Sequence, residues 1–248
     1  MNGVLITGAT SGIGRQLAQD YARLGWQVIA CGRNETVLRE LSSLYASITP
    51  RQFDLTDLQA TVASLESLPF TPTLWILNAG DCEYIDDGKM DATLMARVMM
   101  INVVGMANAI EAIQPHLAHG HRVALVGSIA SELALPRAEA YGASKAAVAY
   151  LARALRLDWA SRGIAVSCVF PGFVATPLTQ KNTFEMPMII SVERASRSIR
   201  QGLAQGKANL YFPARFTGLI RVLGMLPYAW QHHIVSRLFR TKNEKEHS

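Results

Sequence analysis

Cysteine is scarce in this chain of 248 residues, which contains only Cys31, Cys82 and Cys168. Three scattered cysteines without a Cys-x-x-Cys pair exclude a disulfide framework, so a reducing compartment and hence a cytoplasmic protein are expected. Charged residues are also few, at 17%, whereas 50% of the residues are hydrophobic. A disordered chain lacks this much apolar surface, so the composition predicts a globular protein, and the length suits one domain.

Long hydrophobic runs are missing as well. No stretch of about 20 largely apolar residues is present, so no membrane-spanning helix is expected. The run Val4–Ile6 is too short for a signal peptide and leads directly into a glycine-rich turn. The net charge is +5, of which residues 215–248 contribute six basic minus two acidic residues, or +4. Because the charge lies mostly in this tail, nucleic acid is not an expected partner.

Short apolar runs alternate with helical patterns along the chain. The candidate strands are Val4–Thr7, Gln27–Ala30, Arg51–Phe53, Leu74–Leu77, Arg122–Val126, Ala165–Val169 and Asn209–Phe212. The candidate helices are Gly12–Leu24, Glu35–Tyr45, Leu58–Ser67, Ala92–Leu117, Tyr141–Arg162 and Val192–Gln205. Most of these strands lack polar alternation, which is typical of strands buried on both faces. The pattern predicts a single α/β domain with a doubly wound, parallel, seven-stranded, Rossmann-like sheet and helices on both faces.

Three regions interrupt this alternation. Asp81–Asp91 and Pro171–Ile190 follow the fourth and sixth strands, so they are expected at the edge of the sheet where ligands bind. A substrate lid is expected over residues 177–205, within a nucleotide-binding and catalytic domain of residues 1–215. The tail, residues 216–248, is predicted to form one or two short helices broken at Pro227, as a basic amphipathic extension of the same domain.

The turn after the first strand is rich in glycine, at positions 8, 12 and 14 of Thr7–Gly14. Glycines permit a tight turn and a close approach of the backbone to a pyrophosphate. The start of the following helix adds exposed amides and a positive dipole end. The turn therefore predicts a nucleotide site, the alternative being an ordinary strand–helix turn built of small residues.

Tyr141 and Lys145 lie four apart in a helical pattern and therefore share one helix face. A nearby ammonium group would lower the tyrosine pKa from its usual value of about 10, so that the side chain could exchange a proton with a carbonyl or alcohol. Ser128 lies thirteen residues before Tyr141, after the fifth predicted strand, where its hydroxyl could hold the substrate oxygen. The alternative is a tyrosine and a lysine on a solvated helix.

Together these motifs resemble the short-chain dehydrogenase/reductase family over residues 3–213. Thr7–Gly14 matches T-G-x-x-x-G-I-G, and Tyr141 and Lys145 match Y-x-x-x-K. Asn78-Ala79-Gly80 resembles N-N-A-G, with Leu77 in place of the first asparagine. The other residues that match family positions are Asp54, Asn102, Ser128, Pro171, Gly172 and Thr176.

The resemblance implies roles for these residues. Asn102, Ser128, Tyr141 and Lys145 would be catalytic, with Asn102 interrupting its helix and holding a water that links Lys145 to solvent. Lys145 would bind the ribose of the nicotinamide. The residues implied to bind the cofactor are Gly8, Thr10, Ser11, Gly12, Ile13, Gly14, Asp54, Asn78, Ala79, Gly80, Tyr141, Lys145, Pro171, Gly172, Val174 and Thr176.

The stretch after the second strand, Ala30–Asn34, contains no acid. Enzymes that select NAD usually place Asp or Glu there to bind the ribose 2′-hydroxyl, whereas this chain has Gly32. Arg33 can pair with a 2′-phosphate, with a further contact from Ser11. NADP(H) is therefore the predicted cofactor, the alternative being that Arg33 only stacks on adenine.

The predicted function is an NADP(H)-dependent oxidoreductase that acts on a carbonyl or secondary alcohol. The apolar residues Phe184 and Met186–Ile190 in the lid favour a lipophilic substrate, although core packing explains them nearly as well. The alternative is a non-catalytic NADP(H)-binding regulator, against which the complete catalytic set argues. No metal site is predicted, since Asp86, Asp87 and Asp91 suit a solvated loop and His232 and His233 suit a surface.

Two kinds of association are expected. The family usually pairs through the helices that here end near Leu117 and begin at Tyr141, which predicts a homodimer. In the tail, Trp230, Ile234 and Leu238 recur four apart, near Arg221, Arg237, Arg240 and Lys242. Such a basic amphipathic helix suits peripheral membrane contact through residues 216–240, the alternative being that it covers the protein's own substrate pocket.

Overall fold

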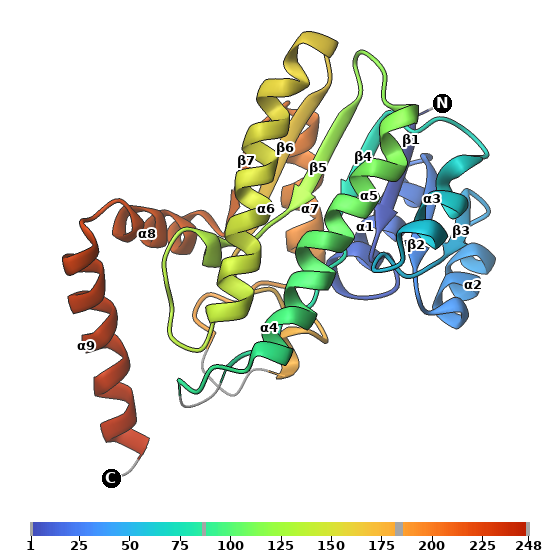
Figure 1. Ribbon diagram of the computed structural model, residues 1–248. Helices are drawn as coiled ribbons and strands as arrows, with labels where there is room; N and C mark the ends of the chain where they lie inside the picture. The colour runs from blue at the N-terminus through green and yellow to red at the C-terminus, as the bar shows by residue number, and fades with distance from the viewer. Residues whose placement is uncertain (1, 86–87, 182–185, 247–248) are drawn as a thin grey trace.

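A seven-stranded sheet forms the centre of the computed structural model, which describes residues 2–85, 88–181 and 186–246, without the side chains of Lys181 and residues 238–246. All pairings are parallel, and the strand order is β3-β2-β1-β4-β5-β6-β7 (Figure 1). The strands are β1 Gly3–Thr7, β2 Gln27–Gly32, β3 Ile48–Gln52, β4 Leu74–Leu77, β5 Arg122–Val126, β6 Ala165–Pro171 and β7 Asn209–Phe212. The predicted doubly wound sheet is confirmed.

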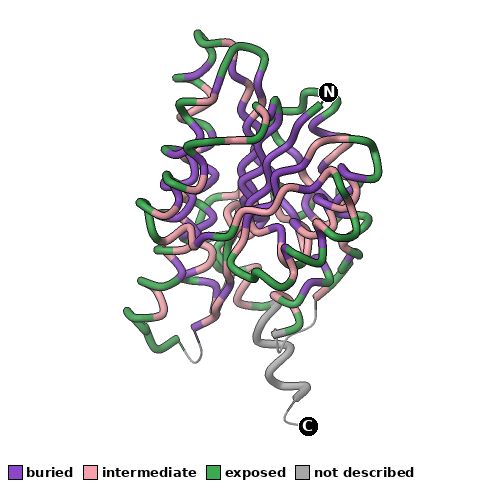
Figure 2. Tube along the Cα trace, turned by 90° about the vertical axis from the view of Figure 1, so that its right-hand side faces the viewer, coloured by how far each residue is buried: buried purple, intermediate pink, exposed green. Residues whose placement is uncertain are grey.

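Helices cover both faces of this sheet (Figures 1 and 2). One hydrophobic core joins the sheet to α1, α2 and α7, and a second joins it to α3, α5 and α6. The helices are α1 Gly12–Arg23, α2 Glu35–Leu44, α3 Leu58–Glu66, α4 Ala92–Met99, α5 Gly105–Ile113, α6 Glu139–Asp158, α7 Val192–Ala204, α8 Ala214–Gly224 and α9 Tyr228–Glu246.

Strand β1 shows why the strands read as unbroken apolar runs. Val4 and Ile6 enter one core and Leu5 enters the other, because successive side chains of a strand point to opposite faces. All three are fully buried. An apolar side chain is therefore needed at every position of this central strand.

Strand β3 differs from the prediction, which placed it at Arg51–Phe53 rather than Ile48–Gln52. Its register pairs Pro50 with Ala30 of β2. Proline cannot donate a backbone hydrogen bond and is tolerated on edge strands. Because β3 lies at the edge of the sheet, Pro50 fits there and does not end the strand.

The helical stretch predicted over Ala92–Leu117 is interrupted at Asn102, as the family resemblance implies. A π-helical turn over Met100–Val104 separates α4 from α5. The run Ala92–His116 contains an 18-residue window with a mean hydropathy of 1.4 and, by length and composition, is apolar enough to cross a membrane, contrary to the expectation that no segment is. In the fold, α5 packs in the second core through Met106, Ile110 and Ile113, so its apolar side covers the sheet.

The stretch expected to form a lid, residues 177–205, holds an irregular connection followed by the helix predicted over Val192–Gln205. Helix α7 occupies the second part of that stretch, and Ala195, Ile199 and Leu203 are buried in the first core. The irregular connection therefore ends at Ser191, the residue that caps α7.

The tail forms two helices that separate at Pro227, as predicted. Helix α8 follows β7 and packs on the body, with the Phe216 ring 5.4 Å from the Phe173 ring. At its other end, Gly224 lies against the backbone oxygen of Glu132, too close for any side chain at position 224. Helix α9 then projects away from the body (Figure 1).

Candidate active site

A cleft crosses the carboxyl edge of the sheet where the strand order reverses, between β1 and β4. Ligands of open α/β sheets bind at such a point. Residues at one end of the cleft are Thr10, Gly32, Arg33, Phe53, Asp54, Leu55 and Ile101. Residues toward the other end are Val126, Gly127, Ser128, Tyr141, Lys145, Pro171, Gly172, Val174 and Thr176. Between them lie Gly8, Ser11, Asn78, Ala79, Gly80 and Asp81, while Gly12 and Ile13 line the second part.

The glycine turn brings the backbone close to the centre of the cleft. Gly8 and Gly12 have φ of +66° and +48°, a conformation that favours glycine. A Cβ at Gly8 would lie 2.9 Å from the Ala79 Cα, and one at Gly14 would collide with the Gly8 oxygen. Ser11 precedes α1 without capping it through its side chain. The turn thus offers bare backbone at a helix start, which fits a pyrophosphate.

A hydrogen-bond network joins this turn to the end of β4. The Thr7 hydroxyl accepts bonds from the backbone amides of Asn78 and Ala79, at 3.0 and 3.1 Å. The Asn78 side chain donates to the backbone oxygen of Thr7 at 3.2 Å. These bonds fix the two walls of the cleft relative to each other. Thr7 opens the glycine motif, yet its bracing role was missed in the sequence.

Arg33 and Asp54 meet at the first end of the cleft, 3.7 Å apart. Burial alone would raise the pKa of Asp54, but two bonds from Thr56, each 2.9 Å, and the Arg33 charge outweigh it and lower the pKa. Gly32 lies against Thr10, since a Cβ there would come within 2.6 Å of the Thr10 methyl. The apolar lining residues Phe53, Leu55 and Ile101 were not predicted from the sequence.

Ser128, Tyr141 and Lys145 come together at the second end of the cleft. Ser128 follows β5 by two residues, and α6 carries the other two side chains. The Ser128 hydroxyl accepts from the Ala130 amide at 3.1 Å and lies close enough to Tyr141 to lower the pKa of the phenol. The Lys145 Nζ donates to the Val126 oxygen at 3.1 Å and lies 5.7 Å from the Tyr141 ring centroid.

The pKa of Tyr141 differs from expectation. Burial raises it above its usual value, opposed only in part by Ser128, so the protein alone holds a protonated phenol. Burial also lowers the pKa of Lys145 to about 8. The expected lowering of the tyrosine pKa by this ammonium group is not seen, because burial and the nearby Cys82 raise the pKa and only Ser128 lowers it.

Asn102 is buried in the π-helical turn and does not line the cleft. Its Oδ1 accepts from the Asp81 amide, and its Nδ2 donates to the Asp81 oxygen, both at 2.8 Å. Nδ2 also donates at 2.9 Å to the Ser144 hydroxyl, which donates at 2.7 Å to the backbone oxygen of Tyr141. A Cβ at Gly80 would lie 2.9 Å from Oδ1 and 3.1 Å from the Lys145 Nζ. Asn102 thus ties the segment after β4 to the helix of Tyr141; Ser144, its partner, was missed.

The connection after β6 is fixed where it borders the cleft. Ala175 donates to the Ile190 oxygen at 2.8 Å, and Ile190 donates to the Phe173 oxygen at 3.0 Å. The Thr179 hydroxyl donates to the Val174 oxygen at 2.6 Å and accepts from the Thr176 amide at 2.9 Å. Thr176 and Val174 are therefore held at the cleft, whereas Phe184 lies outside the described residues.

The remaining polar candidates have structural roles or lie elsewhere. The Ser131 hydroxyl donates to the Ser128 oxygen at 2.7 Å, and Asp91 caps α4 by accepting from the Leu94 amide. Asp86 and Asp87 lie outside the described residues. His232 and His233 are exposed on α9. The part of the chain that the structure describes holds no group of three or more His, Cys, Asp or Glu suited to a metal.

Similarity to known proteins identifies the family of this chain. A family model described as short chain dehydrogenase matches residues 2–186. The chain is 32% identical over 232 residues to an uncharacterized oxidoreductase of Myxococcus xanthus, covering 90% of this chain and 92% of that one. It is 34% identical over 184 residues to a galactitol 2-dehydrogenase (L-tagatose-forming) of Cereibacter sphaeroides, covering 71% and 72%. The chain therefore belongs to the short-chain dehydrogenase/reductase family.

Solved structures share the fold. A short chain dehydrogenase from Burkholderia cenocepacia in complex with NADP matches with a TM-score of 0.83 at 24% identity, over 94% of this chain and 97% of that one. A short-chain dehydrogenase from Sphingobium yanoikuyae in complex with NADPH matches with a TM-score of 0.78, at 24% identity, over 88% and 92%. The Rossmann-like fold is thus confirmed.

Proposed function

We propose that the protein is an NADP(H)-dependent oxidoreductase that interconverts a carbonyl compound and a secondary alcohol. One observation carries this proposal: a single cleft joins Ser128, Tyr141 and Lys145 at one end to Arg33 at the other. A regulator that only binds the nucleotide would need neither a buried phenol nor a serine beside it in the cleft.

Each part of the cleft has a task in this proposal. The turn of Gly8 and Gly12 holds the pyrophosphate, and Asp54 and Arg33 hold the adenosine. The backbone near Val174 and the hydroxyl of Thr176 hold the carboxamide, and Lys145 binds the ribose hydroxyls. The bound nicotinamide supplies or accepts the hydride.

The chain's own residues supply the proton. Ser128 donates a hydrogen bond to the substrate oxygen and holds it beside the Tyr141 hydroxyl. Tyr141 is a phenol in the protein alone, so it is poised to donate its proton to a carbonyl oxygen during reduction. In alcohol oxidation it must first lose that proton, and the Lys145 charge then stabilises the phenolate. Asn102 acts as a positioning residue through Ser144.

Two features support a preference for NADPH. Arg33 is the only charged residue in Ala30–Asn34, and its guanidinium suits a 2′-phosphate. Thr10 occupies the space that a side chain at Gly32 would need, so an acid for the 2′-hydroxyl of NADH fits poorly there. Relatives bind such cofactors, since the Burkholderia cenocepacia structure contains NADP.

The substrate is proposed to be lipophilic. Met188 and Ile189, in the connection beside the cleft, are exposed, and no core packing accounts for them. A relative named sulfoacetaldehyde reductase 2, from Chromohalobacter salexigens, is 33% identical over 190 residues, which supports the carbonyl class but not the lipophilic character.

A homodimer is proposed through two helix faces that lie side by side. On α4, the π turn and α5, the exposed apolar residues are Ala96, Met100, Val104 and Ala107. On α6 they are Ala143, Ala146, Tyr150 and Leu157. Both sets recur three, four or seven apart and so form stripes, which a second copy could bury. Sedimentation of Tyr150→Glu, expected to be monomeric, tests this.

A cytoplasmic location is proposed because Cys31, Cys82 and Cys168 are buried and form no disulfide. The function itself is tested by NADPH oxidation with a panel of aldehydes and ketones of increasing apolar surface. Turnover that requires Tyr141 supports the proposal. Tight NADPH binding without turnover of any carbonyl would favour the regulator instead.

A further inference from the structure

The C-terminal helices expose an apolar surface that their own chain does not cover. On α8, Leu219, Val222 and Met225 lie three apart on one face and point outward. Tyr228 and Trp230 at the start of α9 are 87% and 64% exposed. The inward side of α8 is different, because Phe216 packs on Phe173 beside the cleft. Only α8 therefore borders the site, and the outward face remains in water.

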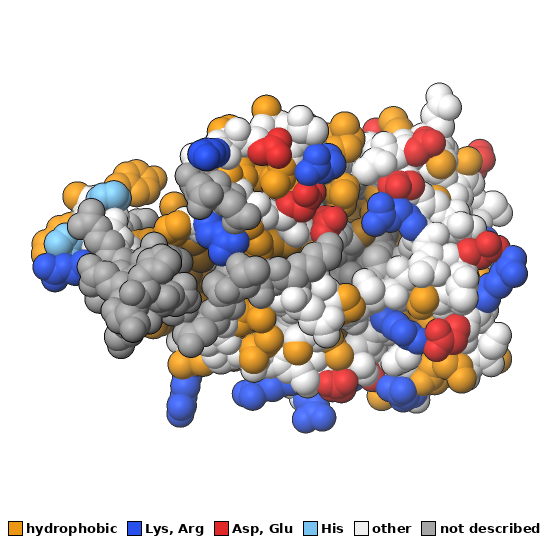
Figure 3. All heavy atoms as spheres, turned by 90° about the horizontal axis from the view of Figure 1, so that it is seen from below, with side chains coloured by type: hydrophobic (Ala, Val, Ile, Leu, Met, Phe, Trp, Pro, Cys, Tyr) orange, Lys and Arg blue, Asp and Glu red, His pale blue; other side chains and the backbone are white. Residues whose placement is uncertain are grey.

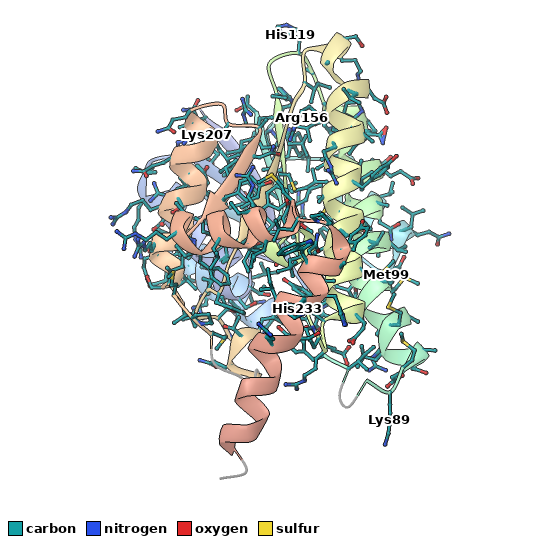
Figure 4. All side chains as sticks on the ribbon, turned by 90° about the vertical axis from the view of Figure 1, so that its left-hand side faces the viewer. Lys89, Met99, His119, Arg156, Lys207 and His233 are labelled. Carbon is teal, nitrogen blue, oxygen red and sulfur yellow. The ribbon has the colours of Figure 1, made fainter. Side chains whose placement is uncertain are left out.

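The same end of the molecule carries further exposed apolar side chains. Met90 follows β4 and Met188 follows β6, while α8 follows β7. The carboxyl ends of parallel strands meet at one edge, so these three segments surround the mouth of the cleft. In Figure 4, α9 with His233 descends at the end of the molecule where Lys89 projects.

Charge at this surface is positive. The tail from residue 215 carries a net +4. Figure 3 looks onto this end, where hydrophobic and basic side chains lie nearest α8 and α9 and acidic side chains lie farther toward the body. Glu132, whose backbone oxygen lies against Gly224, is an acidic residue beside α8. A second copy of the chain would bring the same positive tail, so pairing of two tails would be repulsive. A negatively charged, apolar partner is complementary.

We infer that this surface, formed by Leu219, Val222, Met225, Tyr228 and Trp230, docks the protein on an anionic membrane. Helices with apolar and aromatic residues beside basic ones lie in the headgroup region of a bilayer. Tyrosine and tryptophan favour that interface, and each nearby Lys or Arg adds attraction to anionic lipid. Because the surface surrounds the mouth of the cleft, docking turns the cleft toward the bilayer. The inferred orientation of the cleft rests on the proposal that the substrate is lipophilic. The docking itself does not depend on that proposal.

The test uses the full chain with vesicles of phosphatidylglycerol and phosphatidylcholine, compared with phosphatidylcholine alone. Co-sedimentation is expected with the anionic vesicles, weakening at high salt because exposed charges are screened within ~10 Å at 0.1 M. Tryptophan emission should shift to the blue and Trp230→Phe should abolish the shift, since Trp75 and Trp159 are buried and the half-buried Trp26 packs on the first core beside Tyr21. Protein that stays in the supernatant with anionic vesicles at low salt overturns the inference.

Variants locate the surface. Val222→Ser/Met225→Ser/Tyr228→Ser should reduce vesicle binding by tenfold or more without altering the melting temperature, because all three side chains are exposed. Leu24→Ser/Leu44→Ser changes two exposed leucines at the C-terminal ends of α1 and α2, away from the carboxyl edge of the sheet. This variant should leave vesicle binding unchanged. Equal loss in both variants contradicts the assigned surface. A change of sedimentation coefficient in the first variant, without vesicle binding by the parent, shows that a second copy covers this face and overturns the inference.

Orientation has its own variant. Met90→Ser/Met188→Ser should weaken vesicle binding about threefold, because both side chains would enter the headgroup region. Unchanged binding would show that the tail docks without turning the cleft to the bilayer. NADPH affinity, measured without vesicles, keeps a failure of docking distinct from a failure of the proposed enzymatic function.

Discussion

The two ends of the cleft differ in how firmly their polar side chains are held. At the catalytic end, Asn102 is fully buried, and Lys145 and Ser128 are 4% and 7% exposed. At the adenosine end, the side chains of Arg33 and Asp54 are 69% and 44% exposed. Losing a buried hydrogen-bond partner costs far more than losing an exposed charge pair. The catalytic end should therefore tolerate change poorly, whereas the adenosine end adjusts affinity.

Tyr141→Phe should give the largest effect. The ring is kept and the proton donor is lost, so kcat for carbonyl reduction should fall by about 10² or more. NADPH affinity should change little, because Gly8, Arg33 and Asp54 are untouched. Steady-state kinetics and a fluorescence titration check the two parts. Near-normal turnover would reject the assigned proton donor.

Asn102→Ala tests the catalytic end of the cleft at its most buried polar side chain. Three bonds that hold Asp81 and Ser144 are lost, so the free energy of unfolding should fall by about 2–4 kcal/mol. The kcat should fall as well, because Tyr141 is no longer positioned. Asn108→Ala is the control, since its side chain makes one bond, to the Leu55 oxygen at 2.7 Å. Denaturant unfolding should show the smaller loss of unfolding free energy in Asn108→Ala. Equal losses in the two variants would contradict the role of Asn102 in holding Asp81 and Ser144.

Arg33→Ala probes the exposed end. NADPH should bind about tenfold more weakly, or ~1.4 kcal/mol, and NADH should bind as before. Arg39→Ala removes an exposed arginine from α2 and should change neither affinity. If Arg33→Ala weakens both cofactors equally, Arg33 contacts the adenine and does not select the phosphate.

The pH dependence of NADPH binding gives the smallest effect. Lys145 has a pKa of about 8 in the protein alone, so its ammonium is charged below pH 8 and neutral above. The charged donor binds ribose hydroxyls better, and the dissociation constant should therefore rise about fivefold as pH increases from 7 to 9.5. Lys145→Met should bind weakly with a flat profile. A rise of the same size in that variant would assign the dependence to another group.

Sequence reasoning succeeded where a local pattern determines the structure. The alternation of apolar runs gave the sheet, and the bounds of β4, β5 and β7 match the prediction. It misplaced β3, because the tolerance for Pro50 depends on the edge position, which only the strand order reveals. It correctly placed a helix over Val192–Gln205, where α7 forms and packs its apolar face on the first core.

Most of the motif residues line one cleft, although Asn102 does not, and their energetics could not be predicted. The Tyr141 pKa depends on burial by segments distant in sequence. The spacing of Tyr141 and Lys145 on one helix does not reveal that desolvation. Thr7 and Ser144 were missed for a similar reason. Their hydroxyls act on Asn78, Ala79 and Asn102, partners 42 to 72 residues away.

Transfer of deuterium from the C4 position of labelled NADPH or NADH to a lipophilic ketone tests the central claim most directly. In separate reactions with equal concentrations of the two cofactors, mass spectrometry should find one deuterium on the carbinol carbon of the product. The labelled alcohol should form faster from NADPH than from NADH. This result requires Tyr141 and Arg33 to act within one cleft. Equal or faster labelling from NADH would contradict the account, as would NADPH that binds tightly yet labels no carbonyl compound.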